Sequence, residues 1–189
     1  MTVSYVEIAN QNMDKLAEEI FQLNKKRGWW DNMDRDTDET LQLVSTEVAE
    51  ATEGYRKDLM DDKIKHRKME EVELADALIR VLDLGGRYGW KYDSTACTYD
   101  GKCCESHAAY HLLINKAICA LSDEIKSNPD NIRHFYVDQA YSELVNTIMW
   151  VSQVFEFEIM DALKEKFEYN KTRKDHSREE RAKKHGKKI

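Results

Sequence analysis

Apolar residues recur every three or four positions over most of the chain, which is the spacing of amphipathic helices. The pattern predicts six helices, over about residues 5–27, 36–55, 68–84, 107–126, 132–154 and 155–173. The third is expected to stop at Gly85-Gly86, because glycine commonly ends a helix. Strand-rich folds need more turn residues than the one proline and seven glycines present. The sequence therefore predicts an all-α fold, a bundle of about five or six helices.

The length and the charge of the chain limit the number of domains and the kinds of partner that we expect. The 189 residues suit one compact domain, so residues 1–189 are interpreted as a single domain with a basic C-terminal tail over 174–189. The chain carries a net charge of −7, but residues 171–189 hold nine Lys/Arg and three Asp/Glu, which leaves −13 on the rest. An acidic body disfavours nonspecific binding to a nucleic acid duplex, so no nucleic acid partner is expected.

No stretch of eighteen apolar residues is present, so no membrane partner is expected either. The start lacks the pattern of a signal peptide, and the four cysteines are interpreted as reduced thiols. We expect a cytoplasmic protein, in the host cytoplasm if the source is viral.

Two acidic motifs carry the candidate chemistry. Glu47 and Glu50 lie three residues apart on the second predicted helix, and Glu73 and Asp76 lie three apart on the third. This spacing places each pair on one helix face, where like charges repel unless a cation lies between them. Oxygen ligands of high charge are those that Mg²⁺ or Mn²⁺ prefers. A four-carboxylate metal site is therefore predicted, and such a site usually holds phosphates.

Residues 43–51 and 70–80, which contain the two motifs in this order, resemble the MazG-like all-α nucleotide pyrophosphohydrolases. The similarity covers about residues 13–89 and 159–189, and includes the C-terminal Lys166, Asn170 and Arg173. Residues 95–150 fall outside it and are interpreted as an insertion or as a degenerate second helix pair. Residues 142–146 echo residues 72–76, which favours the helix-pair interpretation.

The resemblance implies hydrolysis of a nucleoside triphosphate to the monophosphate and pyrophosphate. On matching positions, Glu47, Glu50, Glu73 and Asp76 are the implied Mg²⁺ ligands and catalytic residues, with Mn²⁺ as a substitute. The predicted substrate-binding residues are Asn24, Trp30, Arg80, Lys166, Asn170, Arg173 and Lys187. Among them Trp30, with Trp29 as a second candidate, is expected to stack on the base.

Simpler interpretations of these residues stay open. In these interpretations the four acids form a solvated helix face, and Arg80 forms an ion pair with Asp83. Trp29 and Trp30 form a hydrophobic plug between helices. The tail fits a disordered charged end. A zinc site is a weaker candidate, built from residues that suit that metal: Cys97, Cys103, Cys104, His107 and His111.

The leading functional hypothesis is a pyrophosphohydrolase for nucleotide-pool control or house-cleaning. One alternative is a base-specific supplier of a single monophosphate to a phage genome, acting on dGTP/GTP or on dUTP/dCTP. Another is a non-catalytic helical protein for nucleotide binding or assembly. The broad apolar face of the third helix predicts a homo-oligomer, a dimer or a tetramer.

Overall fold

The computed structural model describes residues 5–96, 103–128, 132, 135–174, 178–181 and 183. Its helices, in chain order, are α1 (Tyr5–Lys26), α2 (Thr37–Lys57), α3 (Met69–Tyr88), α4 (His107–Ser127), α5 (Phe135–Val154), α6 (Ile159–Thr172) and α7 (Arg178–Arg181). Within these ranges the only β-type pairing is an isolated bridge between Met60 and Lys68. The predicted all-α class is confirmed, and the MazG-like arrangement stays a prediction.

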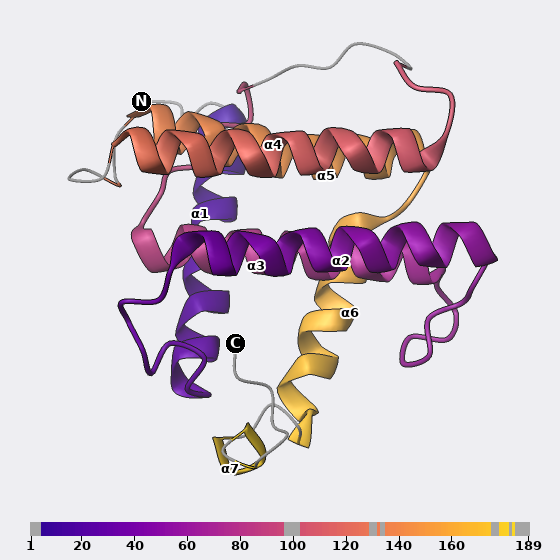
Figure 1. Ribbon diagram of the computed structural model, residues 1–189, viewed down its shortest axis with the longest axis horizontal. Coiled ribbons are helices and arrows are strands. Elements are labelled where there is room, and N and C mark those ends of the chain that lie inside the picture. Colours follow the sequence, from indigo (N-terminus) through magenta and orange to yellow (C-terminus); the bar gives the residue numbers. More distant parts are fainter. Residues whose placement is uncertain are drawn as a thin grey trace.

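Two antiparallel helix pairs form the centre of the molecule. The pair α2–α3 lies in one layer and the pair α4–α5 in another (Figure 1). The helices α2 and α4 pack together, and so do α3 and α5. The helices that correspond in the predicted duplication therefore contact each other. The duplication itself stays a prediction.

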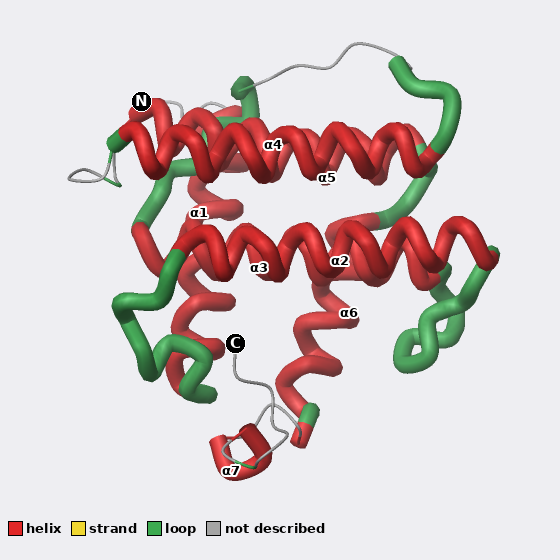
Figure 2. The backbone as a smooth tube through the Cα atoms, in the orientation of Figure 1, coloured by secondary structure: helices red, strands yellow, loops and turns green. Residues whose placement is uncertain are grey.

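Two further helices cross this bundle. Both α1 and α6 pack on α3, and both extend past the α2–α3 layer on the side away from α4–α5 (Figures 1 and 2). The short α7 lies near their far ends. The space between α1 and α6, with α2 and α3 as its base, is where the predicted site residues gather.

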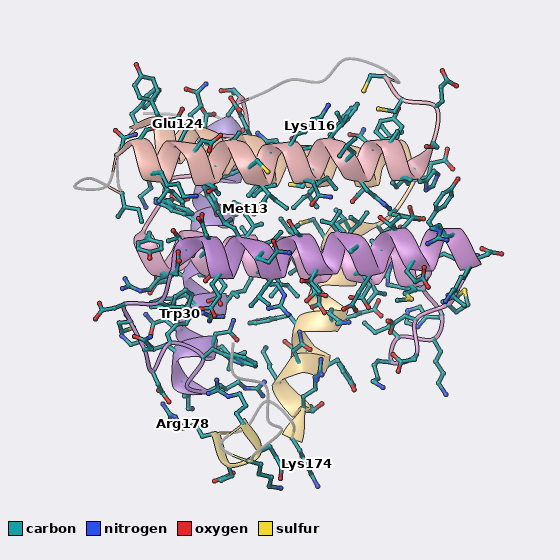
Figure 3. All side chains as sticks on the ribbon, in the orientation of Figure 1. Met13, Trp30, Lys116, Glu124, Lys174 and Arg178 are labelled. Atoms are coloured by element: carbon teal, nitrogen blue, oxygen red, sulfur yellow. The ribbon has the colours of Figure 1, made fainter. Side chains whose placement is uncertain are left out.

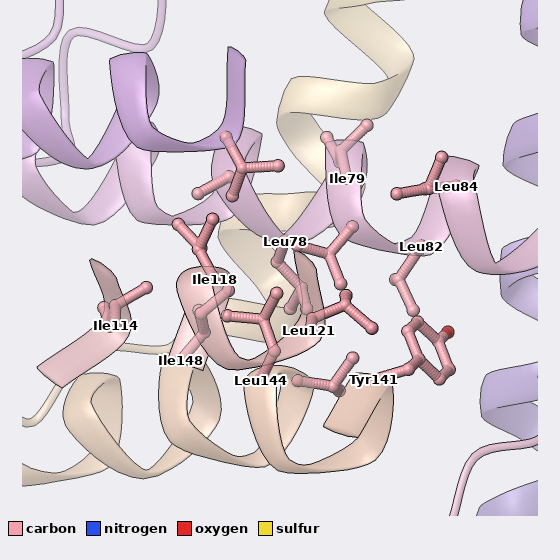
Figure 4. Close-up of a cluster of buried hydrophobic side chains, with 14 of the residues drawn as sticks. Leu78, Ile79, Leu82, Leu84, Ile114, Ile118, Leu121, Tyr141, Leu144 and Ile148 are labelled. Atoms are coloured by element: carbon pink, nitrogen blue, oxygen red, sulfur yellow. The ribbon is translucent and has the colours of Figure 1, made fainter. Parts of the chain in front are cut away.

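The core lies between the two layers and around α3. Leu78 and Leu82 of α3 point toward Leu121 of α4 and Leu144 of α5, and all four are fully buried (Figure 4). Burying a leucine side chain contributes roughly 1.5–3 kcal/mol to folding. The central position of α3 follows from its apolar residues, which cover most of its circumference and contact α1, α2, α5 and α6.

The predicted end of the third helix at Gly85-Gly86 is wrong. The helix α3 continues to Tyr88 and ends at Gly89, which adopts the left-handed conformation with φ 69°. A Cβ atom on Gly85 would collide with the ring of Tyr141, and one on Gly86 with the backbone of α1 at Ala17. Tight packing against two helices thus explains both glycines, and it offsets their poor helix propensity.

Smaller differences occur at other ends. The fifth helix begins at Phe135 rather than 132, and the sixth begins at Ile159 rather than 155. The left-handed residue Glu156, with φ 59°, lies in the turn between α5 and α6. Among the described residues, none of the helices has the length and apolarity needed to cross a membrane.

Candidate functional site

A cavity of about 520 Å³ lies between α1, α2, α3 and α6. This volume is in the range of sites for small molecules and cofactors. The structure brings most of the predicted site residues to its wall. These are Asn24, Glu47, Glu50, Glu73, Asp76, Arg80, Lys166, Asn170 and Arg173.

Three carboxylates converge in this wall. One oxygen from each of Glu47, Glu73 and Asp76 lies within 4.8 Å of the other two, the only such group of possible metal ligands in the described part of the chain. Glu47 and Glu73 are 6% and 7% exposed. Glu50, one turn along α2 from Glu47, also lines the cavity but is exposed to solvent. The two motifs therefore meet as the helix periodicity predicts, with Glu50 outermost.

Two basic side chains bind this acidic group. The Nζ atom of Lys166, which is 4% exposed, lies 3.0 Å from Asp76 Oδ2 and 4.0 Å from Glu73 Oε1. The guanidinium of Arg80 donates from Nε to Glu47 Oε1 at 2.6 Å. Four carboxylates, counting Glu50, thus face two cations, so two negative charges remain when all are ionised.

The electrostatics of the group follow from burial. Desolvation raises the pKa of Glu73 to about 8, although Lys166 opposes the shift. Desolvation also raises the pKa of Glu47, against the charge of Arg80. For Lys166 burial alone would lower the pKa, but the charges of Asp76 and Glu73 raise it above its ordinary value. The group is therefore short of positive charge.

The donor set fits a divalent cation. It consists of carboxylate oxygens alone, which hard cations such as Mg²⁺ and Mn²⁺ prefer. Its excess charge of two equals the charge of one such ion. Glu47, Glu73, Asp76 and the outer Glu50 are the residues that would hold it.

Asn170 and Arg27 connect α6 to this wall. The Nδ2 atom of Asn170 donates to Asp76 Oδ1 at 3.3 Å, while its Oδ1 atom is buried without a hydrogen bond. The guanidinium of Arg27 donates to the carbonyl oxygens of Asn170 and Lys171. The sequence gives no signal for Arg27, because a basic residue at the end of the predicted first helix is already explained by the helix dipole.

The other end of the cavity lies around Asp83. Trp29 lines it, whereas Trp30 is 2% exposed and is absent from the wall. The indole of Trp30 packs edge-on against Phe21 and donates from Nε1 to Asp83 Oδ1 at 3.0 Å. The structure thus places Trp30, labelled in Figure 3, in the core, as the hydrophobic-plug interpretation has it, and brings Trp29 to the cavity wall.

Asp83 and Arg35 complete this end of the wall. Desolvation raises the pKa of Asp83 to about 6, against hydrogen bonds from Trp30 and Asn24 and the charges of Arg35 and Arg80. Arg35 lies in the loop before α2, where no periodic pattern marks it. The sequence signal for Asp83 is its place on α3, seven residues or two turns beyond Asp76.

Lys63 is a further cation of the wall, near Lys166 and Arg173. It lies in the link between α2 and α3, among several charged residues that gave no reason to select it. The predicted contact of Lys187 lies outside the described residues.

The histidines of the suggested zinc site contact an acid of α3. His107 Nδ1 lies 2.7 Å from Glu70 Oε1, and His111 Nε2 lies 3.2 Å from the same oxygen. The ring of His107 is stacked between those of Tyr55 and Phe155. Cys97 lies outside the described residues. These contacts join α4 to the α2–α3 pair.

Comparison of the chain with protein-family models, with curated proteins and with solved structures gives no match. The functional proposal therefore rests on the residues of the cavity and their geometry.

Proposed function

We propose that the chain is a Mg²⁺-dependent nucleoside triphosphate pyrophosphohydrolase, which converts a nucleoside triphosphate to the monophosphate and pyrophosphate. One observation carries the proposal. A carboxylate group that is short of positive charge lines a cavity of about 520 Å³ together with the basic residues Lys63, Lys166 and Arg173, whose charge suits a phosphate chain.

The residues of the wall divide into roles by their chemistry. Glu47, Glu73, Asp76 and Glu50 would hold Mg²⁺, which when bound neutralises phosphate charge and polarises the attacking water. Lys63, Lys166 and Arg173 supply positive charge toward the phosphates.

Glu50 is the best-placed general base. It is the most exposed of the four acids, and its motif partner Glu47 is already bound by Arg80. A carboxylate that accepts a hydrogen bond from water can orient it and take its proton as it attacks the α-phosphorus. Pyrophosphate is then the leaving group, and no serine or cysteine nucleophile is required.

A panel of nucleoside triphosphates with pyrophosphate detection tests the proposal. We expect Mg²⁺-dependent pyrophosphate release by the natural chain and loss of at least about 100-fold in Glu50→Gln and Asp76→Asn. Glu53→Gln is the matched control, because Glu53 lies one turn beyond Glu50 on α2, is outside the cavity wall and pairs with Lys57. Release of orthophosphate alone, or no release from any substrate, would contradict the proposal.

The ion pairs of Arg80 and Lys166 favour one alternative, a carboxylate group neutralised within the chain and devoid of catalytic metal. Such a protein would bind nucleotide or a partner without hydrolysis. Calorimetric titration with Mg²⁺ separates the two, since the proposed enzyme binds the ion and Asp76→Asn binds it more weakly. Absence of Mg²⁺ binding would favour the non-catalytic alternative.

A further inference from the structure

The cavity end opposite the carboxylate group contains an acid and a base that the proposed hydrolysis does not use. Asp83 and Arg35 both line this end, and they are close enough for the charge of each to shift the pKa of the other. The position of Asp83 on α3 places it about 10 Å along the helix from Asp76. That separation is on the scale of the distance from the α-phosphate of a nucleotide to the far edge of its base.

Asp83 is held in place as a hydrogen-bond acceptor. The indole of Trp30 and the side-chain amide of Asn24 both donate to its carboxylate. An ionised carboxylate has about four acceptor positions, so two remain after these bonds. Trp30 is buried and therefore fixed in position, so its hydrogen bond holds the carboxylate of Asp83 in place.

Arg35 offers a donor beside this acceptor. Its side chain is 10% exposed, and its Nε atom is buried without a hydrogen-bond partner. Among the residues that the structure describes, the one ion pair of Arg35 is with Glu39, whose Oε2 atom lies 3.7 Å from Nε. A buried N–H without a partner is unfavourable, and an acceptor on a ligand would satisfy it.

Apolar side chains are also part of the cavity wall. Leu23, Leu43 and Ile79 line the cavity together with Trp29 and the polar residues. Such side chains can accept the faces of a heterocyclic base, whose edge would then meet Asp83 and Arg35.

We propose that Asp83 and Arg35 read the hydrogen-bonding edge of the base and select guanine nucleotides. Guanine is the common base that presents two adjacent donors, N1–H and the 2-amino group, next to an acceptor, O6. The two donors match the two remaining acceptor positions of Asp83, and O6 matches the donor of Arg35. Adenine and cytosine present one amino group each on this edge, and thymine and uracil present one ring N–H. The assignment rests on the proposed function for the reaction at the other end of the cavity.

Pyrophosphate release from six substrates tests the proposal: dGTP, dITP, dXTP, dATP, dCTP and dTTP. We expect kcat/KM to be highest for dGTP and about 10-fold lower for dITP, which lacks the 2-amino group. In Asp83→Asn we expect kcat/KM for dGTP to fall about 10- to 100-fold, mostly through KM, because the contact is remote from the reacting phosphorus. The same variant should gain activity on dXTP, whose 2-oxo group accepts from the new amide.

Two comparisons make the test decisive. Asp83→Asn keeps an acceptor for Trp30, so a gain on dXTP with a loss on dGTP cannot come from misfolding. The control Asp123→Asn lies on the exposed face of α4 and should leave all six values unchanged. Equal activity on all bases, preference for another base, or an equal loss on every substrate in Asp83→Asn would overturn the guanine assignment while the pyrophosphohydrolase proposal stands.

If no substrate releases pyrophosphate, the proposed function fails and calorimetric titration with dGMP decides the base assignment. Binding of dGMP that is at least about 10-fold weaker in Asp83→Asn supports the base site without hydrolysis. No difference between the two proteins, or no binding by either, overturns it.

Discussion

At the scale of single residues, the cavity wall is governed by buried charge. Glu73 and Lys166 have opposite charges and are both almost fully buried, and Lys166 serves Asp76 as well. Removing a buried charge from such a group usually costs more than its pairing contributed, because the partner is left without compensation. Two predictions follow from this property.

The first concerns pH. The pKa of Glu73 is about 8 in the folded protein, above its ordinary value of 4.5, so the folded state holds the proton more tightly than the unfolded state. The contribution of Glu73 to the free energy of unfolding should be highest below pH 4.5, fall as the pH rises toward 8, and level off above it. Chemical denaturation without divalent cations at pH 5, 6, 7 and 8 measures this slope.

Glu73→Gln should flatten the slope, and the exposed Glu53→Gln should leave it unchanged. Mg²⁺ should also flatten it, because the ion favours the ionised carboxylate. If the pH slope of the free energy of unfolding were equal in Glu73→Gln and in the natural chain, Glu73 would not be its source.

The second concerns Lys166. We expect Lys166→Met to lower the free energy of unfolding by about 3 kcal/mol at pH 8, because Asp76 and Glu73 lose their buried counter-charge. The control is Lys164→Met, since Lys164 is exposed and pairs with the exposed Asp161. Equal stability of the two variants in urea would show that Lys166 does not balance the group.

At the scale of helices, periodicity predicts much of the structure and close packing explains the errors. The apolar spacing places α1 to α6 within a few residues, and the i,i+3 spacing puts each acidic pair on one face of its helix. The packing of α2 on α3 then brings the two faces together. It misplaces the end of α3 because local propensity does not include Ala17 and Tyr141, which are distant in the sequence.

The same limit applies to the base end of the cavity. Neighbouring tryptophans give no signal for which one turns inward. Gly28, with φ 83°, directs the chain so that Trp29 faces the cavity and Trp30 the core. Arg35 and Lys63 lie in links without periodicity, so only the folded chain shows that they reach the wall.

The contact of α1 with α3 yields a prediction at this scale. Gly86→Ala adds a Cβ atom that would meet the carbonyl of Ala17, and α3 can avoid it only by moving away from α1. We expect a loss of about 1–3 kcal/mol in thermal or urea unfolding, despite a gain of about 1 kcal/mol in helix propensity. Gln42→Ala on the exposed side of α2 should change stability little. A more stable Gly86→Ala protein would contradict the close approach.

At the scale of the whole molecule, a single chain supplies every element of the cavity wall. The broad apolar face of α3 was the reason to predict an oligomer, and α1, α2, α5 and α6 of the same chain contact this helix. The oligomer itself stays a prediction. The C-terminal helix α7 contacts residues of the cavity wall and of the loop after α1. Arg178 donates to both oxygens of Asp31, and Arg181 lies 4.3 Å from the ring centre of Trp29 and donates to the carbonyl of Arg27.

These contacts predict a role for the tail in binding. The double variant Arg178→Ala/Arg181→Ala should raise KM for the nucleotide several-fold, because Trp29 and the loop after α1 lose their support, while kcat stays within about 2-fold. Stability should change by less than about 1 kcal/mol, since exposed ion pairs contribute little. The control is Lys183→Ala, whose partner Glu180 is exposed. Unchanged KM in the double variant would exclude this role.

The pairing of Lys166 with Asp76 also has a consequence for synthesis of the chain. A ribosome completes α2 and α3 with their carboxylates first, then makes α4 and α5, and makes α6 with its lysine only after these four helices. Until then Arg80 of α3 can pair with Glu47, but Asp76 and Glu73 lack the counter-charge of Lys166 that favours their burial in ionised form. The docking of α6 therefore supplies the counter-charge for Asp76 and Glu73. A chain interrupted before Lys166 would contain α2 and α3 without this counter-charge.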